Sequence, residues 1–188
     1  MLGNQNGGVD TPSGDLRDGP DLLLRRWRLD DAPAVHELVA GSIEHLAPWL
    51  PWAAGGYSEQ QAVEFLEDAS AKWDSREAFH YALVLPGQGA VGSASLMDRI
   101  GGDGLEIGYW LARPHWGRGY ITRAVRALVR EAFRAGADRV EILHDSANVR
   151  SGAVPRRLGF TEVERRPAPR PWMSGQAGTH VVWRLRSA

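Results

Sequence analysis

The segment from Tyr109 to Thr122 constrains the fold most, because it joins a strand to a helix through a glycine turn. The glycines Gly117 and Gly119 stand directly before the helix. Backbone N–H groups at a helix start have no intrahelical partner and carry partial positive charge, so the arrangement favours an anion such as phosphate. A tight turn that binds nothing is the alternative interpretation.

The spacing of these glycines excludes two familiar phosphate motifs. The sequence contains no G-x-x-x-x-G-K-[ST], and Thr122 stands where the third glycine of G-x-G-x-x-G belongs. The segment is therefore neither a P-loop nor a dinucleotide fingerprint.

The net charge of minus one conceals a strong asymmetry along the chain. Residues 113–188 carry 15 Arg and 6 acids, whereas residues 1–112 carry 7 bases and 17 acids. We expect the basic part to attract an anion, with Arg118 and Arg123 adding charge beside the glycine turn; a dispersed solvated surface is the alternative. Nucleic acid is not an expected partner, because the bases form no tract and no binding motif accompanies them.

Length and composition indicate one globular domain. A chain of 188 residues with 43% hydrophobic residues can build a sizeable core. The absence of cysteine excludes disulfides, thiolate metal sites and a cysteine nucleophile. No apolar run reaches membrane-spanning length and no signal-peptide pattern is present, so we expect a cytoplasmic protein without a membrane partner.

Hydrophobic periodicity predicts a mixed α/β domain over residues 21–188. Residues 1–20 are rich in Gly, Asp, Pro and Asn without a hydrophobic period, and are expected to form a flexible tail. Ser58 and Gln61 form a capping box before a long helix. Antiparallel strands precede the strand, glycine turn and helix. The expected strands cover 22–29, 79–85, 90–97, 105–111, 140–144, 160–164 and 180–185.

The segment Trp116-Gly117-Arg118-Gly119-Tyr120-Ile121 resembles the Q/R-x-x-G-x-G/A acyl-CoA loop of GNAT-type N-acetyltransferases. Its leading Trp is similar to the RimL/RimJ-like ribosomal-protein N-terminal acetyltransferase branch. The resemblance covers roughly residues 22–186, and three other segments agree in order and separation. These are Glu106-Ile107-Gly108-Tyr109-Trp110-Leu111, Asn148-x-x-Ser151 with Leu158-Gly159-Phe160, and Leu46-x-Pro48-Trp49-x-Pro51-Trp52.

The resemblance implies the GNAT acyl-CoA N-acyltransferase fold. In that fold a mixed central sheet of about seven strands is flanked by helices, and the fourth and fifth strands splay apart to admit coenzyme A. Acetyl-CoA is then the donor substrate, and no metal is expected. The six histidines also show no metal-ligand spacing.

The resemblance also implies which residues contact coenzyme A. The loop would hold the pyrophosphate, and the pantetheine arm would pair with the backbone of the preceding strand end. The expected contacts are Leu111, Ala112, Arg113, Trp116, Gly117, Arg118, Gly119, Tyr120, Ile121, Thr122, Asn148 and Ser151. Ile121 departs from the family's Gly or Ala, so its side chain must point away from the pyrophosphate.

Glu106 is the candidate for the base that takes a proton from the acceptor amine. Its position alternates with the apolar positions of its strand, and a protonated amine cannot attack a thioester. A solvated carboxylate or an ion pair is the alternative interpretation.

The candidate acid is Ser151, which would protonate the departing thiolate. Many family members place a tyrosine seven residues after the asparagine, but Pro155 occupies that position here. The resemblance to the RimL/RimJ-like branch implies that Ser151 replaces this tyrosine as the acid. The alternative makes Ser151 the N-cap of a helix that starts near Gly152, which would put Pro155 in the first turn, where a proline is tolerated.

Four aromatic residues are predicted to contact the acceptor: Trp49, Trp52, Tyr109 and Trp172. The tryptophans lie in Pro-bearing segments rather than at regular core spacing, although packing is the alternative for any one of them.

Together these features predict an acyl-CoA-dependent N-acyltransferase that passes an acetyl group directly to a primary amine in a ternary complex. The acceptor is a protein N-terminal amine or a small-molecule amine such as an antibiotic or aminoacyl nucleotide. Succinyl-CoA as donor, and a non-catalytic module that senses coenzyme A, are the alternatives. A homodimer is possible from the habit of the family.

Overall fold

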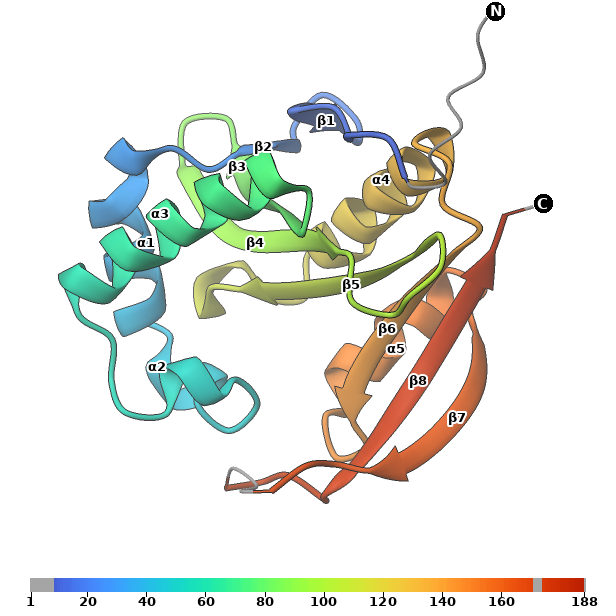
Figure 1. The fold of residues 1–188 in the computed structure, drawn as a ribbon. Coiled ribbons are helices and arrows are strands. Elements are labelled where there is room, and N and C mark those ends of the chain that lie inside the picture. Colours follow the sequence, from blue (N-terminus) through green and yellow to red (C-terminus); the bar gives the residue numbers. More distant parts are fainter. Residues whose placement is uncertain (1–8, 171–173, 188) are drawn as a thin grey trace, which may run out of the picture.

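The computed structural model describes residues 9–170 and 174–187. Its centre is an open eight-stranded sheet with helices on both faces (Figure 1). The strands are β1 (Asp15–Arg17), β2 (Leu23–Arg26), β3 (Ala78–Leu85), β4 (Gly89–Met97), β5 (Gly104–Leu111), β6 (Arg139–Asp145), β7 (Thr161–Pro167) and β8 (Thr179–Arg186). The helices are α1 (Ala32–Ala40), α2 (Ile43–Leu46), α3 (Glu59–Ser75), α4 (Tyr120–Arg134) and α5 (Val149–Arg157), with 3-10 turns at η1 (Leu29–Asp31), η2 (Pro51–Ala53) and η3 (Arg113–His115).

The strand order is β1-β2-β3-β4-β5-β6-β8-β7, and only the pair β5 and β6 is parallel. That parallel pair is joined by the glycine turn and α4, as a crossover connection requires. The predicted mixed sheet is therefore confirmed, with one strand more than expected.

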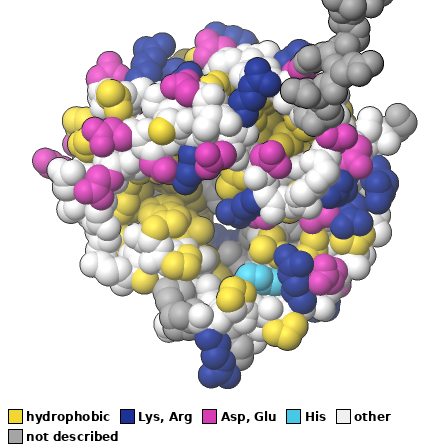
Figure 2. Space-filling view, in the orientation of Figure 1, with side chains coloured by type: hydrophobic (Ala, Val, Ile, Leu, Met, Phe, Trp, Pro, Cys, Tyr) yellow, Lys and Arg dark blue, Asp and Glu magenta, His cyan; other side chains and the backbone are white. Residues whose placement is uncertain are grey.

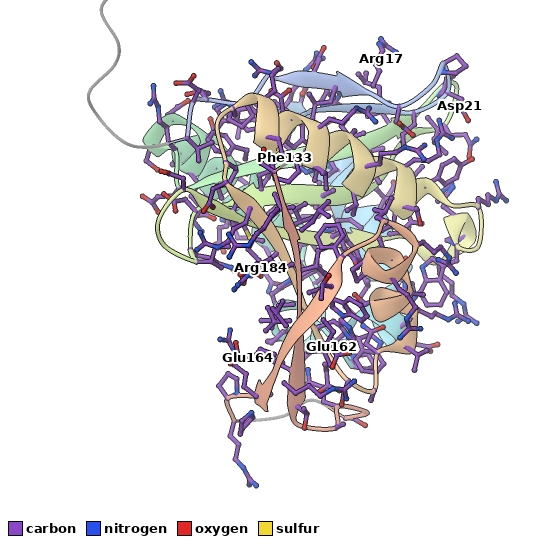
Figure 3. All side chains as sticks on the ribbon, turned by 90° about the vertical axis from the view of Figure 1, so that its right-hand side faces the viewer. Arg17, Asp21, Phe133, Glu162, Glu164 and Arg184 are labelled. Atoms are coloured by element: carbon purple, nitrogen blue, oxygen red, sulfur yellow. The ribbon has the colours of Figure 1, made fainter. Side chains whose placement is uncertain are left out.

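The additional strand is β1, which lies in the segment predicted to be a tail. It pairs with β2, and Figure 3 shows it alongside α4. The buried carboxylate of Asp18 receives hydrogen bonds from Arg126 at 2.6 Å and Arg130 at 3.3 Å, both on α4. Hydrophobic period alone did not predict this strand, because Leu16 is its one apolar residue packed on the core and ion pairs of Asp18 add to the attachment.

Helix α3 forms where its capping box predicts. Ser58 Oγ accepts from the Gln61 N–H at 3.2 Å, and Gln61 Oε1 accepts from the Ser58 N–H at 2.9 Å. The buried face consists of Ala62, Leu66, Ala69 and Trp73. This face packs α3 on the sheet beside α1.

Alternation along β5 directs side chains into two separate layers. Leu105 and Ile107 pack in the core shared with α4, whereas Trp110 packs in the core shared with α1 and α3. The residues of β5 that point towards α1 and α3 are thus Glu106, Gly108 and Trp110. No helix within the described ranges is long and apolar enough to cross a membrane.

The parallel pairing of β5 and β6 ends early. The last paired residues are Glu106 and Glu141, although β5 continues to Leu111 and β6 to Asp145. Figure 1 shows the two strands diverging beyond this point. The predicted splay of the fourth and fifth strands corresponds to β5 and β6, because β1 shifts the count by one.

Helix α5 starts at Val149, before the Gly152 start that the N-cap interpretation of Ser151 requires. Asn148 is its N-cap, and Asn148 Oδ1 accepts from the Ser151 N–H at 3.2 Å. The alternative interpretation of Ser151 as the N-cap is therefore wrong. Pro155 lies inside the helix rather than in its first turn.

Candidate active site

The glycine turn leaves an open anion cradle at the start of α4. Gly117 and Gly119 have positive φ angles of 74° and 79°, which side chains rarely adopt. No atom lies within 4 Å of a Cβ built on either glycine. Gly119 is the N-cap and supplies no side chain, so the first N–H groups of α4 face open space. Such a helix start can receive an anion.

The flanking residues of the turn support this geometry. Ile121 and Tyr120 pack against the core between the sheet and α4. The side chain of Ile121 therefore points away from the cradle, as its departure from the family pattern requires.

The two arginines expected to add charge at the cradle differ in their surroundings. Arg123 donates to Asp21 Oδ1 at 2.6 Å and to Asp18 Oδ2 at 3.3 Å. Figure 3 shows Asp21, in the turn between β1 and β2, beside α4. The carboxylates of Asp18 and Asp21 thus neutralise the charge of Arg123. Arg118 is therefore the better candidate for binding a phosphate.

The strand end predicted to pair with the pantetheine arm is only partly open to the splay. The Ala112 N–H donates to Val91 O at 2.9 Å, and the Arg113 N–H donates to Ser42 Oγ at 3.2 Å. Backbone groups alternate in direction along an antiparallel strand. The backbone N–H and C=O groups of Tyr109 and Leu111 therefore point to the β6 side of β5. Both residues lie beyond Glu106, the last residue of β5 paired with β6.

Trp116 links three elements around the splay. Its indole N–H donates to Leu111 O at 3.1 Å, and the edge of His45 meets it at a centroid distance of 4.2 Å. The guanidinium of Arg150, on α5, lies 4.4 Å from the Trp116 ring centroid. Such cation–π contacts contribute roughly 0.5–2 kcal/mol. Trp116 therefore ties the glycine loop to α2 and α5.

A cavity of about 550 Å³ lies between the sheet and the layer of α1 and α3. Figure 2 shows a hollow in the middle of this face with hydrophobic side chains on its wall. Gly108, Tyr109 and Trp110 line it, so the cavity reaches β5 beyond the last residue paired with β6. Its apolar and aromatic walls include Val35, Leu50, Trp52, Tyr57, Phe65 and Trp110.

Polar groups converge on the same cavity from α3 and the sheet. Glu64 and Asp68 line it from α3, and Asp68 Oδ2 accepts from Lys72 Nζ at 2.7 Å. His80 lies 2.7 Å from Ser95 Oγ through Nδ1, and burial lowers the pKa of His80 to about 4. At neutral pH His80 is therefore uncharged. Because Asp68 is already paired with Lys72, Glu64 is the cavity carboxylate best placed to attract an ammonium group.

Glu106 is buried and ion-paired. Its carboxylate receives a hydrogen bond from Arg99, which itself lines the cavity. Glu141 stands beside it in register on β6 and receives a hydrogen bond from Arg184 at 2.7 Å. The ion pair that the sequence offered as an alternative is present, and the carboxylate sits where β5 and β6 diverge.

Ser151 faces the splay from the start of α5. The Tyr109 hydroxyl lies 3.1 Å from Ser151 Oγ and donates to Ser151 O at 2.9 Å. Asn148 caps α5 through its side chain. The structure thus brings Tyr109 to Ser151, 42 residues further along the chain.

The predicted acceptor tryptophans do not share one role. Trp52 lines the cavity, is 42% exposed, and meets Trp110 and Tyr57 edge-on at 6.1 and 5.8 Å. Trp49 is half-buried and does not line the cavity, whereas Trp172 lies outside the described residues.

Sequence reasoning missed the polar residues of α3 that line the cavity. Gln61, Glu64, Asp68 and Lys72 recur at helical spacing, which is the signal that would have placed them on one face. That face resembles an ordinary solvated surface until the fold supplies the opposing wall. Among the described residues, no group of three or more His, Asp or Glu is arranged to hold a metal ion.

The family model for acetyltransferase (GNAT) domains matches residues 21–161 of the chain. The chain belongs to the GNAT acetyltransferase family. As a GNAT domain it is an acetyltransferase, and the sheet with its splayed parallel pair is the fold of this family.

One curated relative of this GNAT domain is YdaF of Bacillus subtilis (strain 168), whose name gives ribosomal N-acetyltransferase as a provisional activity. The two are 32% identical over 145 residues, which cover 75% of this chain and 78% of YdaF.

Solved structures of similar fold include three acetyltransferases. RimL, a ribosomal L7/L12 alpha-N-protein acetyltransferase with coenzyme A, has a TM-score of 0.83 at 22% identity and covers 92% of this chain and 97% of its own. The microcin C7 self-immunity acetyltransferase MccE, with acetyl-CoA and AMP, has 0.84 at 19%, covering 95% and 99%. RimJ of Mycobacterium smegmatis has 0.80 at 23%, covering 93% and 86%. At these identities the likeness concerns the fold.

Proposed function

We propose that this GNAT domain transfers the acetyl group of acetyl-CoA to the N-terminal amine of a protein. One observation carries the proposal: the aromatic-walled cavity reaches β5 where its pairing with β6 has ended, and the phosphate cradle opens at the end of the same strand. A donor held by the cradle and an amine in the cavity would therefore meet at Gly108 to Leu111.

The donor side of the proposal depends on the cradle. The first N–H groups of α4 and Arg118 would hold the pyrophosphate. The backbone of Tyr109 and the N–H of Leu111 would hold the pantetheine arm like an added strand, because the Leu111 carbonyl already accepts from Trp116. When bound, acetyl-CoA supplies an activated acyl group. A backbone N–H at this strand end would stabilise the charge that develops on the thioester oxygen.

The acceptor side depends on the cavity. Figure 2 shows acidic side chains along α3 above the hollow, and Glu64 is one that lines it. The carboxylate attracts the ammonium form of the amine, and the walls of Trp52 and Trp110 exclude water from the group that follows. Attack requires the neutral amine, so a base must take one proton.

Glu106 is the base in this proposal, acting through a water molecule because Arg99 already occupies its carboxylate. The change Glu106→Gln is expected to lower kcat about 100-fold and to alter the pH profile of the reaction. Steady-state kinetics between pH 6 and 9 measures both. A variant with unaltered kcat and an unaltered profile removes Glu106 from the reaction.

Calorimetric titration tests the donor directly. Acetyl-CoA is expected to bind at about micromolar Kd, and 3'-dephospho-acetyl-CoA more weakly if the basic C-terminal part contacts the phosphate. Succinyl-CoA in the same titration tests the alternative acyl group. The absence of heat up to about millimolar acetyl-CoA would contradict the proposed donor.

The acceptor is tested with labelled acetyl-CoA and a mixed panel. One half contains peptides with free N-termini and one half contains small primary amines such as amino sugars and aminoacyl nucleotides. YdaF and RimL, whose names refer to ribosomal proteins, support the peptide half. Label found only on small amines would replace the protein acceptor by a small molecule. The aromatic walls of the cavity make a small-molecule amine the second candidate.

The same proposal places the chain in the cytoplasm, because acyl-CoA donors are used there. A homodimer is proposed from the habit of the family and is tested by sedimentation equilibrium.

A further inference from the structure

Helix α5 contains a proline that leaves one carbonyl without its usual donor. Pro155 has no N–H, so Ser151 O, one turn earlier, loses its intrahelical hydrogen bond. The Tyr109 hydroxyl donates to this oxygen at 2.9 Å. Tyr109 lies on β5 beyond the last residue paired with β6, so the bond spans the splay.

The same phenol is also within reach of the Ser151 side chain. Tyr109 Oη lies 3.1 Å from Ser151 Oγ. A phenol carries one proton, so while that proton is donated to Ser151 O, the Ser151 hydroxyl donates to Tyr109 Oη. The two hydroxyls therefore form a pair that can exchange donor and acceptor roles.

Burial keeps the phenol of this pair protonated. The half-buried Tyr109 side chain extends from β5 to α5, and burial raises the pKa of Tyr109 to about 12. The phenol is thus a proton donor at neutral pH. Tyr109 also lines the acceptor cavity, so the pair lies where the cavity meets the splay.

We propose that Tyr109 is a positioning residue that holds the Ser151 hydroxyl as proton donor to the thiolate released by acetyl transfer. This inference rests on the proposed function and gives Tyr109 a second role beside the acceptor contact predicted for it. The phenol comes from β5, so it reaches Ser151 although α5 has a proline at the position of the family's tyrosine.

The proposed step balances. The amine nitrogen forms a bond to the thioester carbon, and the carbon–sulfur bond breaks with its electron pair going to sulfur. The Ser151 hydroxyl proton passes to sulfur, and the Tyr109 hydroxyl turns its hydrogen bond from Ser151 O to Ser151 Oγ, where it stabilises the negative charge left on that oxygen. The proton that the amine nitrogen loses to Glu106 through water returns through solvent to Ser151 Oγ.

The variant Tyr109→Phe removes the phenol and keeps the ring. We expect kcat to fall roughly 10- to 100-fold, with KM for acetyl-CoA within twofold of the wild type. Tyr81→Phe is the matched control, because the Tyr81 hydroxyl also donates to a carbonyl, Ser13 O at 2.8 Å, away from the cavity and the splay. The control is expected to lose stability and keep its kcat.

A second variant separates chemistry from helix capping. Pro155→Ala restores an N–H that can bond to Ser151 O, so the double variant Tyr109→Phe/Pro155→Ala should regain the Tm lost by Tyr109→Phe. We expect kcat to stay low in the double variant. Recovery of both Tm and kcat would mean that Tyr109 only caps α5, which overturns the inference.

Binding of coenzyme A gives a readout without turnover. The ultraviolet absorbance of the thiolate, followed against pH in the saturated complex, measures the pKa of the bound thiol. Hydrogen bonds from the hydroxyl pair favour the thiolate, so this pKa is expected to be about one unit lower in the wild type than in Tyr109→Phe. Equal values overturn the inference. No binding of coenzyme A by the wild type overturns the proposed function first, and the inference with it.

Discussion

At the scale of single residues, backbone angles decide whether the loop before α4 can receive a phosphate. Gly119 is the N-cap of α4 at φ 79°, with open space where a side chain would stand. Any other residue there strains the backbone and occupies the cradle. The same left-handed geometry occurs at Gly136, just beyond α4, where no ligand is proposed.

Gly119→Ala and Gly136→Ala form a matched pair for this point. Both are expected to lower the free energy of unfolding by about 1 kcal/mol, because both residues have positive φ and open surroundings. Only Gly119→Ala should also weaken acetyl-CoA binding, by about tenfold. Chemical denaturation and calorimetric titration measure the two effects. Equal affinity in the two variants would contradict the phosphate assignment.

Trp52 tests the acceptor cavity at the same scale. Trp52→Ala removes an exposed wall of the cavity, so KM for the amine should rise about tenfold while the affinity for acetyl-CoA is retained. Trp49→Ala, at a residue that does not line the cavity, should raise this KM less. The opposite order of the two effects would place the acceptor elsewhere.

At the scale of elements, α4 both forms one side of the cradle and binds residues 10–18, the segment that contains β1. Its first turn borders the glycine cradle, while its side chains and C-terminal end hold residues 10–18. Glu131 accepts from the Ser13 N–H and from Arg134 Nη2 at 2.6 Å. The hydrogen bond from Arg134 lowers the pKa of Glu131 to about 2, and the Ser13 N–H adds to this effect.

The low pKa of Glu131 makes a pH-dependent contribution to stability. Because the ordinary value is 4.5, the unfolded chain binds the proton first as the pH falls. The stabilisation is complete above about pH 4.5 and is lost as the pH falls towards 2. Glu131→Gln should therefore lower the free energy of unfolding by about 2 kcal/mol at pH 7, with the difference shrinking below pH 4.5.

Denaturation by urea at a series of pH values measures this contribution. Glu67→Gln, at an exposed carboxylate of α3, is the control and should change stability by less than about 0.5 kcal/mol. A constant difference between wild type and Glu131→Gln from pH 7 to pH 2.5 would contradict the titration of Glu131.

At the scale of the whole molecule, one sheet carries two cores. Leu66 of α3 is buried in the core on the cavity face, and Leu128 of α4 in the core on the opposite face. Both cores use strands of the same sheet, so we expect them to unfold together. The cavity and the cradle therefore belong to one cooperative unit.

Leu66→Ala and Leu128→Ala test this unit. The two side chains are 2% and 0% exposed, and each change should lower the free energy of unfolding by about 2–5 kcal/mol. Tryptophan fluorescence and far-ultraviolet circular dichroism should report a single coincident transition in both variants. Two separated transitions would show that the faces unfold independently.

The sequence by itself determined most of the elements, although not β1, and the glycine turn before α4. Local signals are strong there: the glycines before α4 set backbone angles, and the capping box of Ser58 and Gln61 starts α3. The phosphate cradle is built from consecutive residues, so its geometry follows from their order. Alternation along β5 likewise placed Glu106 and Trp110 on one face.

Only the tertiary structure decided which distant residues meet. The α3 residues Glu64 and Asp68 line a cavity because α3 packs against the sheet. Asp18 secures a segment predicted to be a tail because α4 presents arginines to it. Tyr109 reaches Ser151 across the splay because Pro155 leaves a carbonyl open. These contacts depend on where whole elements pack, which a local sequence pattern does not encode.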